Sequence, residues 1–325
     1  LKRGDKSVLY YIKDSPQPGV NRFRSGRPDQ LEGALSRDGR WLATHRFPST
    51  VVTLHCLRTR RSIGSLGDPT PLRKTNDPDY RLFFSGDGRT VVIASYLRNA
   101  FLDLLLQIDL IETISGKTRS RVLVRNIHPP RLEWLPDGRT WLGISRLSEM
   151  TLWDFTPRVE SATHETLPTH WNDLASPDAA RAFRAMHALA LAPDLSGPYV
   201  ERQLAPTRTE PRVESWIDEL GADTFAERKR ASEQLIAAGE SSRKALEAAY
   251  YHDDLEIRAR ARTVLKSVDL AQPQTLRTLR AIELLEMLRR PAALRRLSTG
   301  LPHSRITEHA TAALERLKAR PARPE

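Results

Sequence analysis

The sequence predicts a two-part chain in which a β-repeat region precedes an all-α region. Two observations predict this fold class. An Asp-Gly-Arg turn recurs at Asp38, Asp87 and Asp137, so the turns lie 49 and then 50 residues apart. After Phe155 the strand pattern ends and helical periodicity follows. A chain of 325 residues is long enough to bury two separate cores.

Each Asp-Gly-Arg turn is followed by two apolar segments that predict strands. Glycine takes a positive φ in such turns without steric cost. The first strands are "WLATHR", "TVVIAS" and "TWLGIS", and the second are "TVVTLHCL", "LLLQIDLIE" and "EMTLWDF". Strands at even spacing with a period near 50 residues indicate a β-repeat architecture whose sheets stack radially.

The ends of the second strands carry a family resemblance. The best match is Leu152-Trp153-Asp154-Phe155; the preceding repeat has Ile111-Glu112 at the Trp-Asp positions, followed by Ser115-Gly116-Lys117. These segments resemble WD repeats of a β-propeller, and the resemblance implies about three blades within residues 1–156. We interpret the recurring turn residues and the Trp-Asp pair as structural positions of the repeat: Asp38, Gly39, Asp87, Gly88, Asp137, Gly138, Trp153 and Asp154.

Three blades make an incomplete ring, because propellers close with about four to eight blades. An open arc would leave an unpaired edge, which natural sheets avoid. The chain also begins with Leu rather than Met. We therefore expect an N-terminally truncated protein whose missing blades lie upstream. A strand from elsewhere in the chain, or closure by oligomerisation, would also complete the ring.

The C-terminal region divides into a polar linker at 157–175, a helical domain at 176–320 and a tail at 321–325. Ser176 followed by Pro177 predicts a helix N-cap and first turn. Two later helices share one apolar spacing, 49 residues apart, which predicts a stripe facing a neighbouring helix. These residues are Ile257, Ala261, Val264, Leu265 and Val268, then Ile306, Ala310, Ala313, Leu314 and Leu317.

The segment "SSRKALEAAYYHDDLEIRARARTVLKSV" resembles a HEAT-like repeat, with a first helix, a turn at Asp253-Asp254 and a second helix. The whole order resembles a group of bacterial WD-repeat proteins with a helical C-terminal domain. This resemblance implies an architecture and supplies no chemistry.

Motifs of the common catalytic classes are absent from the sequence. It has no Gly-rich dinucleotide or phosphate loop, no Gly-x-Ser-x-Gly and no His-Glu-x-x-His. His164, Glu165 and His170 do not have the spacing of a zinc site. The single cysteine, Cys56, excludes an intramolecular disulfide and a Cys-rich metal site. We therefore predict no catalytic, cofactor-binding or metal-binding residues and do not expect an enzyme.

The net charge of +11 raises the question of nucleic-acid binding. However, the sequence contains no run of Lys and Arg residues that could follow a phosphate backbone. Its positive charge comes mostly from arginine, with 42 arginines and 9 lysines. Arg258, Arg260 and Arg262 alternate along one helix and are a possible anion-binding or partner-binding face. The interpretation that we favour is a solvated helix surface interleaved with acidic residues.

Together these observations predict a non-catalytic scaffold that binds other proteins, since propellers and solenoids present broad, rigid surfaces. Two alternatives stay open. One is a basic nucleic-acid-binding protein; the other is the regulatory C-terminal part of an enzyme whose catalytic domain lies upstream. No run of 18 apolar residues predicts a membrane segment. A cytoplasmic location is favoured.

Overall fold

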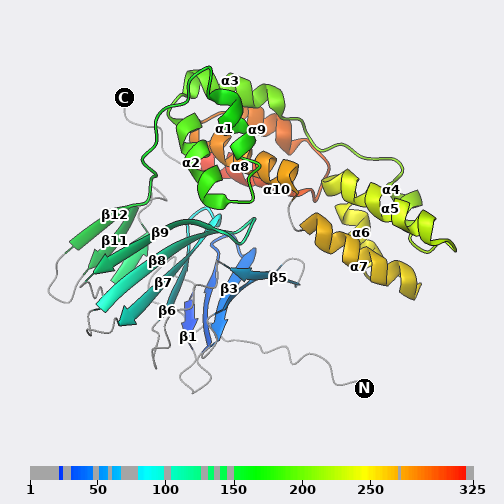
Figure 1. Cartoon of the computed structure of the whole chain (residues 1–325), viewed down its shortest axis with the longest axis horizontal. Helices are drawn as coiled ribbons and strands as arrows, with labels where there is room; N and C mark the ends of the chain where they lie inside the picture. Colours follow the sequence, from blue (N-terminus) through cyan, green and yellow to red (C-terminus); the bar gives the residue numbers. More distant parts are fainter. Residues whose placement is uncertain are drawn as a thin grey trace. The chain divides into compact units, whose positions relative to one another are not determined.

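The chain forms two compact units, a β unit (Leu1–Phe155) and a helical unit (Thr156–Glu325) (Figure 1). The computed structural model describes residues 22–24, 31–46, 51–57, 61–66, 80–98, 104–125, 131–134, 140–144, 150–269 and 272–319. The turn residues Asp137 and Gly138 and the predicted tail at 321–325 lie outside these ranges. The prediction of a β part followed by an α part is confirmed.

The β unit contains three antiparallel sheets, in each of which strands adjacent in sequence are paired. The first sheet consists of β1 (Arg22–Arg24), β2 (Leu31–Leu35), β3 (Trp41–Arg46), β4 (Val52–Cys56) and β5 (Arg61–Leu66). The second consists of β6 (Tyr80–Phe84), β7 (Thr90–Arg98), β8 (Leu104–Glu112) and β9 (Thr118–Arg125). The third consists of β10 (Arg131–Trp134), β11 (Thr140–Ile144) and β12 (Met150–Asp154). In the described part of the chain these strands do not form a closed ring.

The second sheet is covered on both faces, which explains why its strands are the most continuously apolar. Leu82, Val91 and Ile93 pack in one core with residues of the first sheet such as Leu54. The side chains that alternate with them, including Val92, pack in a second core with the third sheet. Because successive side chains of a strand point to opposite faces, a strand buried on both sides must be apolar throughout.

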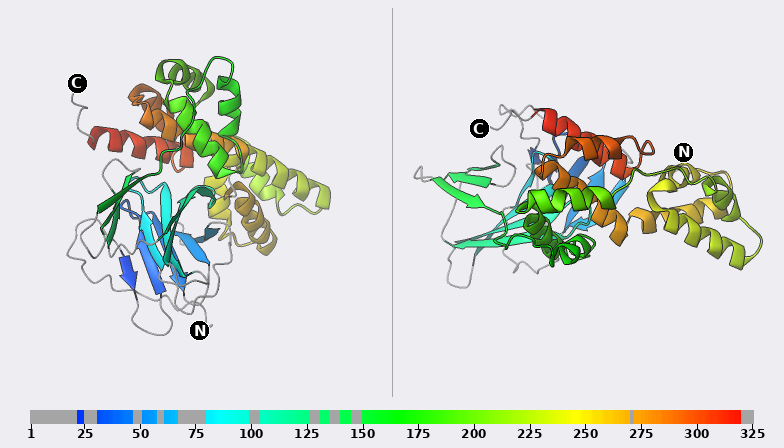
Figure 2. Two further views of the ribbon diagram at one scale, coloured as in Figure 1. Left: turned by 60° about the vertical axis from the view of Figure 1, so that its left-hand side comes forward. Right: turned by 90° about the horizontal axis from the view of Figure 1, so that it is seen from above.

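The helical unit contains ten α-helices and one 3₁₀ turn among its described residues. They are α1 (Leu167–Asp173), α2 (Ala179–Ala190), α3 (Pro193–Gln203), α4 (Val213–Glu219), α5 (Phe225–Ala238), η1 (Gly239–Ser241), α6 (Arg243–Ala249), α7 (Leu255–Asp269), α8 (Pro273–Met287), α9 (Pro291–Ser298) and α10 (Arg305–Ala319). Helix α8 is buried on nearly all sides, as a central helix must be. In both views of Figure 2, α4–α7 extend away from the remaining helices.

Three of the helical hairpins share one design: α1/α2, α4/α5 and α6/α7. Each begins with a helix of seven residues and continues, after a five-residue connection, into a longer helix. Counted from the N-cap residue of each long helix, the seventh residue that follows is a buried alanine and the eleventh is a buried leucine. They are Ala185, Ala231 and Ala261, then Leu189, Leu235 and Leu265. A small residue there lets the two helices approach closely.

The N-caps of the long helices are Asp178, Thr224 and Asp254. Asp178 accepts hydrogen bonds from the backbone N–H groups of Ala180 and Arg181. The prediction of Ser176 as this N-cap was wrong by two residues, because its hydroxyl instead accepts from the Asp178 N–H. The segment predicted as a linker, 157–175, contains α1, whose Leu167 and Trp171 are buried.

Arginine side chains stabilise the hairpin connections by donating hydrogen bonds to backbone carbonyl groups. Arg280, which is 1% exposed, donates from Nη1 to the oxygens of Leu174 and Ser176, at 2.7 Å each. Within their own hairpins, Arg228 and Arg258 each donate to the two carbonyls that precede the N-cap. Carbonyl groups at helix ends lack intrahelical partners, and these arginines donate to such acceptors in place of water.

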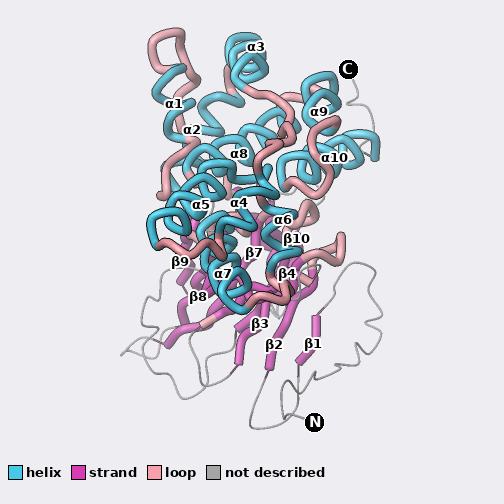
Figure 3. Tube along the Cα trace, turned by 90° about the vertical axis from the view of Figure 1, so that its right-hand side faces the viewer, coloured by secondary structure: helices cyan, strands magenta, loops and turns pink. Residues whose placement is uncertain are grey.

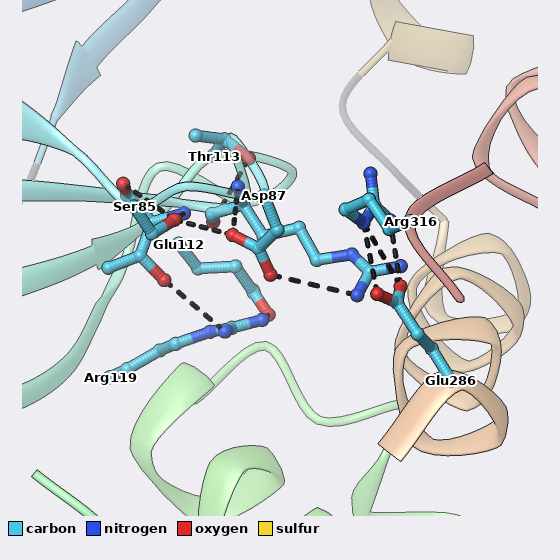
Figure 4. Close-up of polar contacts among 9 residues, drawn as sticks. Ser85, Asp87, Glu112, Thr113, Arg119, Glu286 and Arg316 are labelled. Atoms are coloured by element: carbon cyan, nitrogen blue, oxygen red, sulfur yellow. Dashed lines mark hydrogen bonds and ion pairs between the residues drawn. The ribbon is translucent and has the colours of Figure 1, made fainter. Parts of the chain in front are cut away.

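Two buried carboxylates join the helices across longer distances. Glu240, 4% exposed in its side chain, accepts from Nε of Arg305 at 2.7 Å, and the Arg305 Nη2 donates to the Val268 oxygen. Glu286 of α8 pairs with Arg316 of α10 at 2.8 Å (Figure 4). The first pair links α10 to the α4–α7 hairpins, and the second links α10 to α8.

We expect Arg280→Met to lower the free energy of unfolding by ~3 kcal/mol, because the buried oxygen of Leu174 and the partly buried oxygen of Ser176 both lose this charged donor. Arg277→Met is the matched control on the same helix. Arg277 lies over the Trp171 ring, with 5.1 Å from its Cζ atom to the ring centroid. Its loss should cost less than about 1 kcal/mol. Urea unfolding followed by far-UV circular dichroism measures both, and equal effects would contradict the role given to Arg280.

Candidate functional site

The Asp-Gly-Arg turns are small polar structures built in the same way at two places. In the first, the Ser36 hydroxyl donates to Asp38 Oδ1 at 2.6 Å and accepts from the Trp41 N–H at 2.9 Å. Asp38 also accepts from the Arg40 N–H. Gly39 has a φ of +69°, as the turn chemistry predicts. The serine, which the sequence interpretation did not single out, holds both sides of the turn.

The second turn repeats these contacts with Ser85, Asp87, Gly88 and Thr90. Gly88 has a φ of +71°. In the third repeat, Leu135 replaces the serine, and that turn lies outside the described residues. The aspartates therefore act on backbone N–H groups and a neighbouring hydroxyl, which is a structural use of a carboxylate.

Next to the second turn lies a buried polar network (Figure 4). Glu112, at the position of the aspartate in the Trp-Asp pair, forms an ion pair with Arg119 at 2.8 Å; the side chains are 1% and 4% exposed. Thr113 donates its hydroxyl to the Arg89 oxygen, which ties the end of β8 to the start of β7. The carboxylate in this repeat is thus held by an arginine of the neighbouring strand.

Trp153 and Asp154 end the third sheet. Trp153 packs against the core shared with the second sheet, opposite Trp141 on β11. Asp154 is exposed and lies opposite Thr140. Trp153 therefore serves packing.

The three arginines of α7 have three different environments. Arg258 donates to the His252 and Asp253 carbonyls of its own hairpin. Arg260 pairs with Glu256 one turn earlier. Arg262 lies over the Tyr250 ring, with 4.4 Å from its Cζ atom to the ring centroid. At roughly 100° per residue, Arg258 and Arg262 share one side of the helix and Arg260 lies on nearly the opposite side. The use of these arginines for a partner stays a prediction.

Several other arginines of the helical unit are engaged in the same way. Arg290 donates to the Pro193 oxygen and Arg296 to the Glu201 oxygen. A guanidinium that faces a carbonyl or a carboxylate is less available to a phosphate. Much of the positive charge of the helical unit is therefore used inside the fold.

Exposed apolar side chains are the feature that the sequence interpretation missed. On β12, Met150 is 73% and Leu152 62% exposed. In the first turns of α5 and α7, Phe225 is 67% and Leu255 73% exposed. The alternation in "MTLWD" could have indicated the first group. The second gives no sequence signal, because a leucine or phenylalanine at the start of an amphipathic helix is ordinarily assigned to the core.

Ionisable groups do not gather into a metal site: no cluster of three or more His, Cys, Asp or Glu side chains suited to a metal ion occurs in the described ranges. Of the helices that the structure describes, none combines the length and the hydropathy that a membrane span requires. Comparison of the sequence with known protein families finds no match, and neither does comparison with curated proteins.

We expect Glu112→Gln to lower the stability of the β unit by ~3 kcal/mol, since it leaves the Arg119 guanidinium buried without its counter-charge. The control is Arg121→Gln in the same sheet, where the Arg121–Asp109 pair is partly solvated, at 33% and 10% side-chain exposure. That change should cost less, about 1–2 kcal/mol, because the Gln107 amide still donates to Asp109 Oδ2. Thermal unfolding of both variants makes the comparison, and a larger loss for Arg121→Gln would refute the assignment.

His55 gives the β unit a pH dependence. Burial lowers the pKa of His55 below its ordinary value of 6.5, and its Nε2 lies 2.9 Å from the Thr44 hydroxyl oxygen. The unfolded chain therefore binds the proton more tightly, so the contribution of His55 to stability is full above about pH 6.5 and declines as the pH falls below it.

We accordingly expect His55→Gln to flatten the change in unfolding midpoint between pH 8 and pH 5. His303→Gln, a change at an exposed histidine, should leave that change as it is. Denaturant titrations at several pH values test this, and an unchanged pH profile for His55→Gln would show that another group is responsible.

Proposed function

We propose that this chain is a non-catalytic scaffold that binds other proteins. The observation that carries the proposal is the outer face of the third sheet. Leu142 lies opposite Leu152 and Ile144 opposite Met150, so four large apolar residues share the β11–β12 part of this face, next to which the register places Arg131 and Glu133 of β10. Met150 and Leu152 are largely exposed. An apolar sheet face of this kind is typical of a surface that binds another protein.

The architecture proposed for the β unit is a set of WD-type propeller blades. Support comes from the meander order of the strands, the two matching Ser-x-Asp-Gly-Arg turns and the packing of the second sheet against its two neighbours. In a propeller, a further blade would pack on the outer face of β10–β12. The experiment below therefore has to distinguish a blade from a partner.

For the helical unit we propose a HEAT-like array. Its support is the recurrence of hairpins with a short first helix, a capped connection and a small residue at one buried position. Arrays of such hairpins present extended surfaces, which suits a scaffold. The engagement of many arginines with carbonyl groups favours protein partners over nucleic acid.

The test is capture of proteins from a native lysate on the full chain, compared with a variant carrying Met150→Lys and Leu152→Lys. We expect discrete partners that survive nuclease and high salt, and whose recovery falls about tenfold or more in the variant, because lysine cannot enter an apolar interface. Leu123→Lys on β9 is the control, since Leu123 is 60% exposed on another sheet.

Two results would overturn the proposal. Recovery that disappears with nuclease would assign the chain to nucleic-acid binding. The second result concerns the variant with Met150→Lys and Leu152→Lys. If it recovers the same partners as the unaltered chain but no longer self-associates in sedimentation experiments, this face joins β-sheets to one another and binds no partner.

A further inference from the structure

The first turns of α5 and α7 lie together at the free end of the α4–α7 hairpins; we call residues 223–227 and 251–256 the α5/α7 tip. Nε of Arg228 on α5 lies 4.0 Å from Oε1 of Glu256 on α7. Gly221, after α4, packs so closely on α7 that an added Cβ would meet the Ile257 side chain at 2.9 Å. Figure 3 shows the α4–α7 hairpins from this end.

Three large apolar side chains project from the tip into solvent. Phe225 is 67%, Tyr251 78% and Leu255 73% exposed. Phe225 and Leu255 hold the same position in consecutive hairpins, immediately after the N-cap. The core of these hairpins is formed by other side chains, among them Leu235 and Leu265. Neither exposed residue is therefore required for packing. With Tyr251, whose ring contacts that of Tyr250, they place exposed apolar surface on both hairpins, and we call these three side chains the apolar patch of the tip.

Acidic residues flank these side chains in the sequence. The two tip segments, "DTFAE" and "YHDDLE", contain five carboxylates and no lysine or arginine, and one of the five, Glu256, pairs with Arg260 and lies 4.0 Å from Arg228. The nearest arginines in sequence, Arg228 and Arg258, donate to backbone carbonyls of their own hairpins. Among the described residues, no cation forms an ion pair with Asp223 or Asp253.

One carboxylate of the tip, that of Asp254, is stabilised in its ionised form. The backbone N–H groups of Ile257 and Glu256 donate to Asp254 Oδ1, and these hydrogen bonds lower the pKa of Asp254. Glu227 stands in the first turn of α5, where the helix dipole favours an anion. Stabilisation of the helix ends explains why acidic residues occur here. It does not explain why Phe225, Tyr251 and Leu255 are exposed. An anionic rim around an apolar patch then selects the charge of whatever covers it.

We propose that the α5/α7 tip docks a basic amphipathic segment of a partner protein, with apolar side chains on Phe225, Tyr251 and Leu255 and lysines or arginines facing the acidic rim. The inference rests on the proposed scaffold function and adds to it the site and the chemistry of one partner. The apolar contacts supply most of the affinity, and the rim supplies specificity for charge and a faster association.

The experiment selects random 16-residue peptides displayed on phage against the full chain. Representative peptides are then synthesised, and their affinities are measured by fluorescence polarisation. We expect the selected peptides to be enriched in Lys or Arg together with Leu, Ile or Phe. Their binding should weaken about tenfold or more with the double change Phe225→Ser and Leu255→Ser. It should weaken several-fold, roughly fivefold, with Asp223→Asn and Asp253→Asn, and more at low salt than at high salt.

The matched control is Leu191→Ser, because Leu191 is 58% exposed at the end of α2, away from the tip. This change should leave peptide affinity unaltered. All of these substitutions are at exposed positions, so unaltered circular dichroism and unfolding midpoints should accompany them. Peptides of acidic or uncharged composition, or peptides that bind the Phe225→Ser and Leu255→Ser variant with full affinity, would overturn the proposal.

The variant with Met150→Lys and Leu152→Lys separates this inference from the proposed function. If the tip acts as proposed, that variant binds the selected peptides normally. If no peptide depends on the tip while the β12 face still captures partners, the tip proposal fails and the scaffold function stands. If both sets of variants are without effect, both proposals fail.

Discussion

The helical unit depends on hydrogen bonds that arginine side chains donate to backbone carbonyl groups. Short helices in succession leave many helix ends, and each end leaves carbonyl groups without intrahelical partners. Arg228, Arg258 and Arg280 satisfy such groups at the equivalent place in three hairpins. The first two do so within their own hairpin, whereas Arg280 reaches the α1/α2 connection from α8. The same contact thus closes a local turn in two places and joins distant helices in the third.

This use of arginine changes the meaning of the chain's charge. A net charge of +11 suggests an anionic partner when the sequence is considered alone. In the folded helical unit, many guanidinium groups face carbonyl oxygens or buried carboxylates such as Glu240 and Glu286. What is exposed at the α5/α7 tip is negative and apolar. Local charge, and not the net charge, therefore determines which partner a surface can bind.

The β unit follows a different constraint, which is that a sheet must cover its apolar faces. The second sheet does so on both sides, using Leu82 and Ile93 toward the first sheet and Val92 toward the third. The buried Glu112–Arg119 pair and the Ser-x-Asp-Gly-Arg turns fix the strand ends without adding chemistry. Among the residues that the structure describes, Met150 and Leu152 on the outer face of β10–β12 depart from this rule, and that is why this face is the candidate that we propose for a protein contact.

The sequence by itself determined what depends on interactions between near neighbours. Gly39 and Gly88 in their turns, the end of α5 before Gly239 and the buried stripe from Ile257 to Val268 all follow from local conformational preference and periodicity. Only the tertiary structure decided the rest. The acceptors of Arg280 lie 106 and 104 residues away in the chain, so no local pattern identifies them. For the same reason the sequence did not reveal that Phe225 and Leu255 remain in solvent. Whether a side chain is buried depends on which distant element covers it, and periodicity within one helix carries no information about that element.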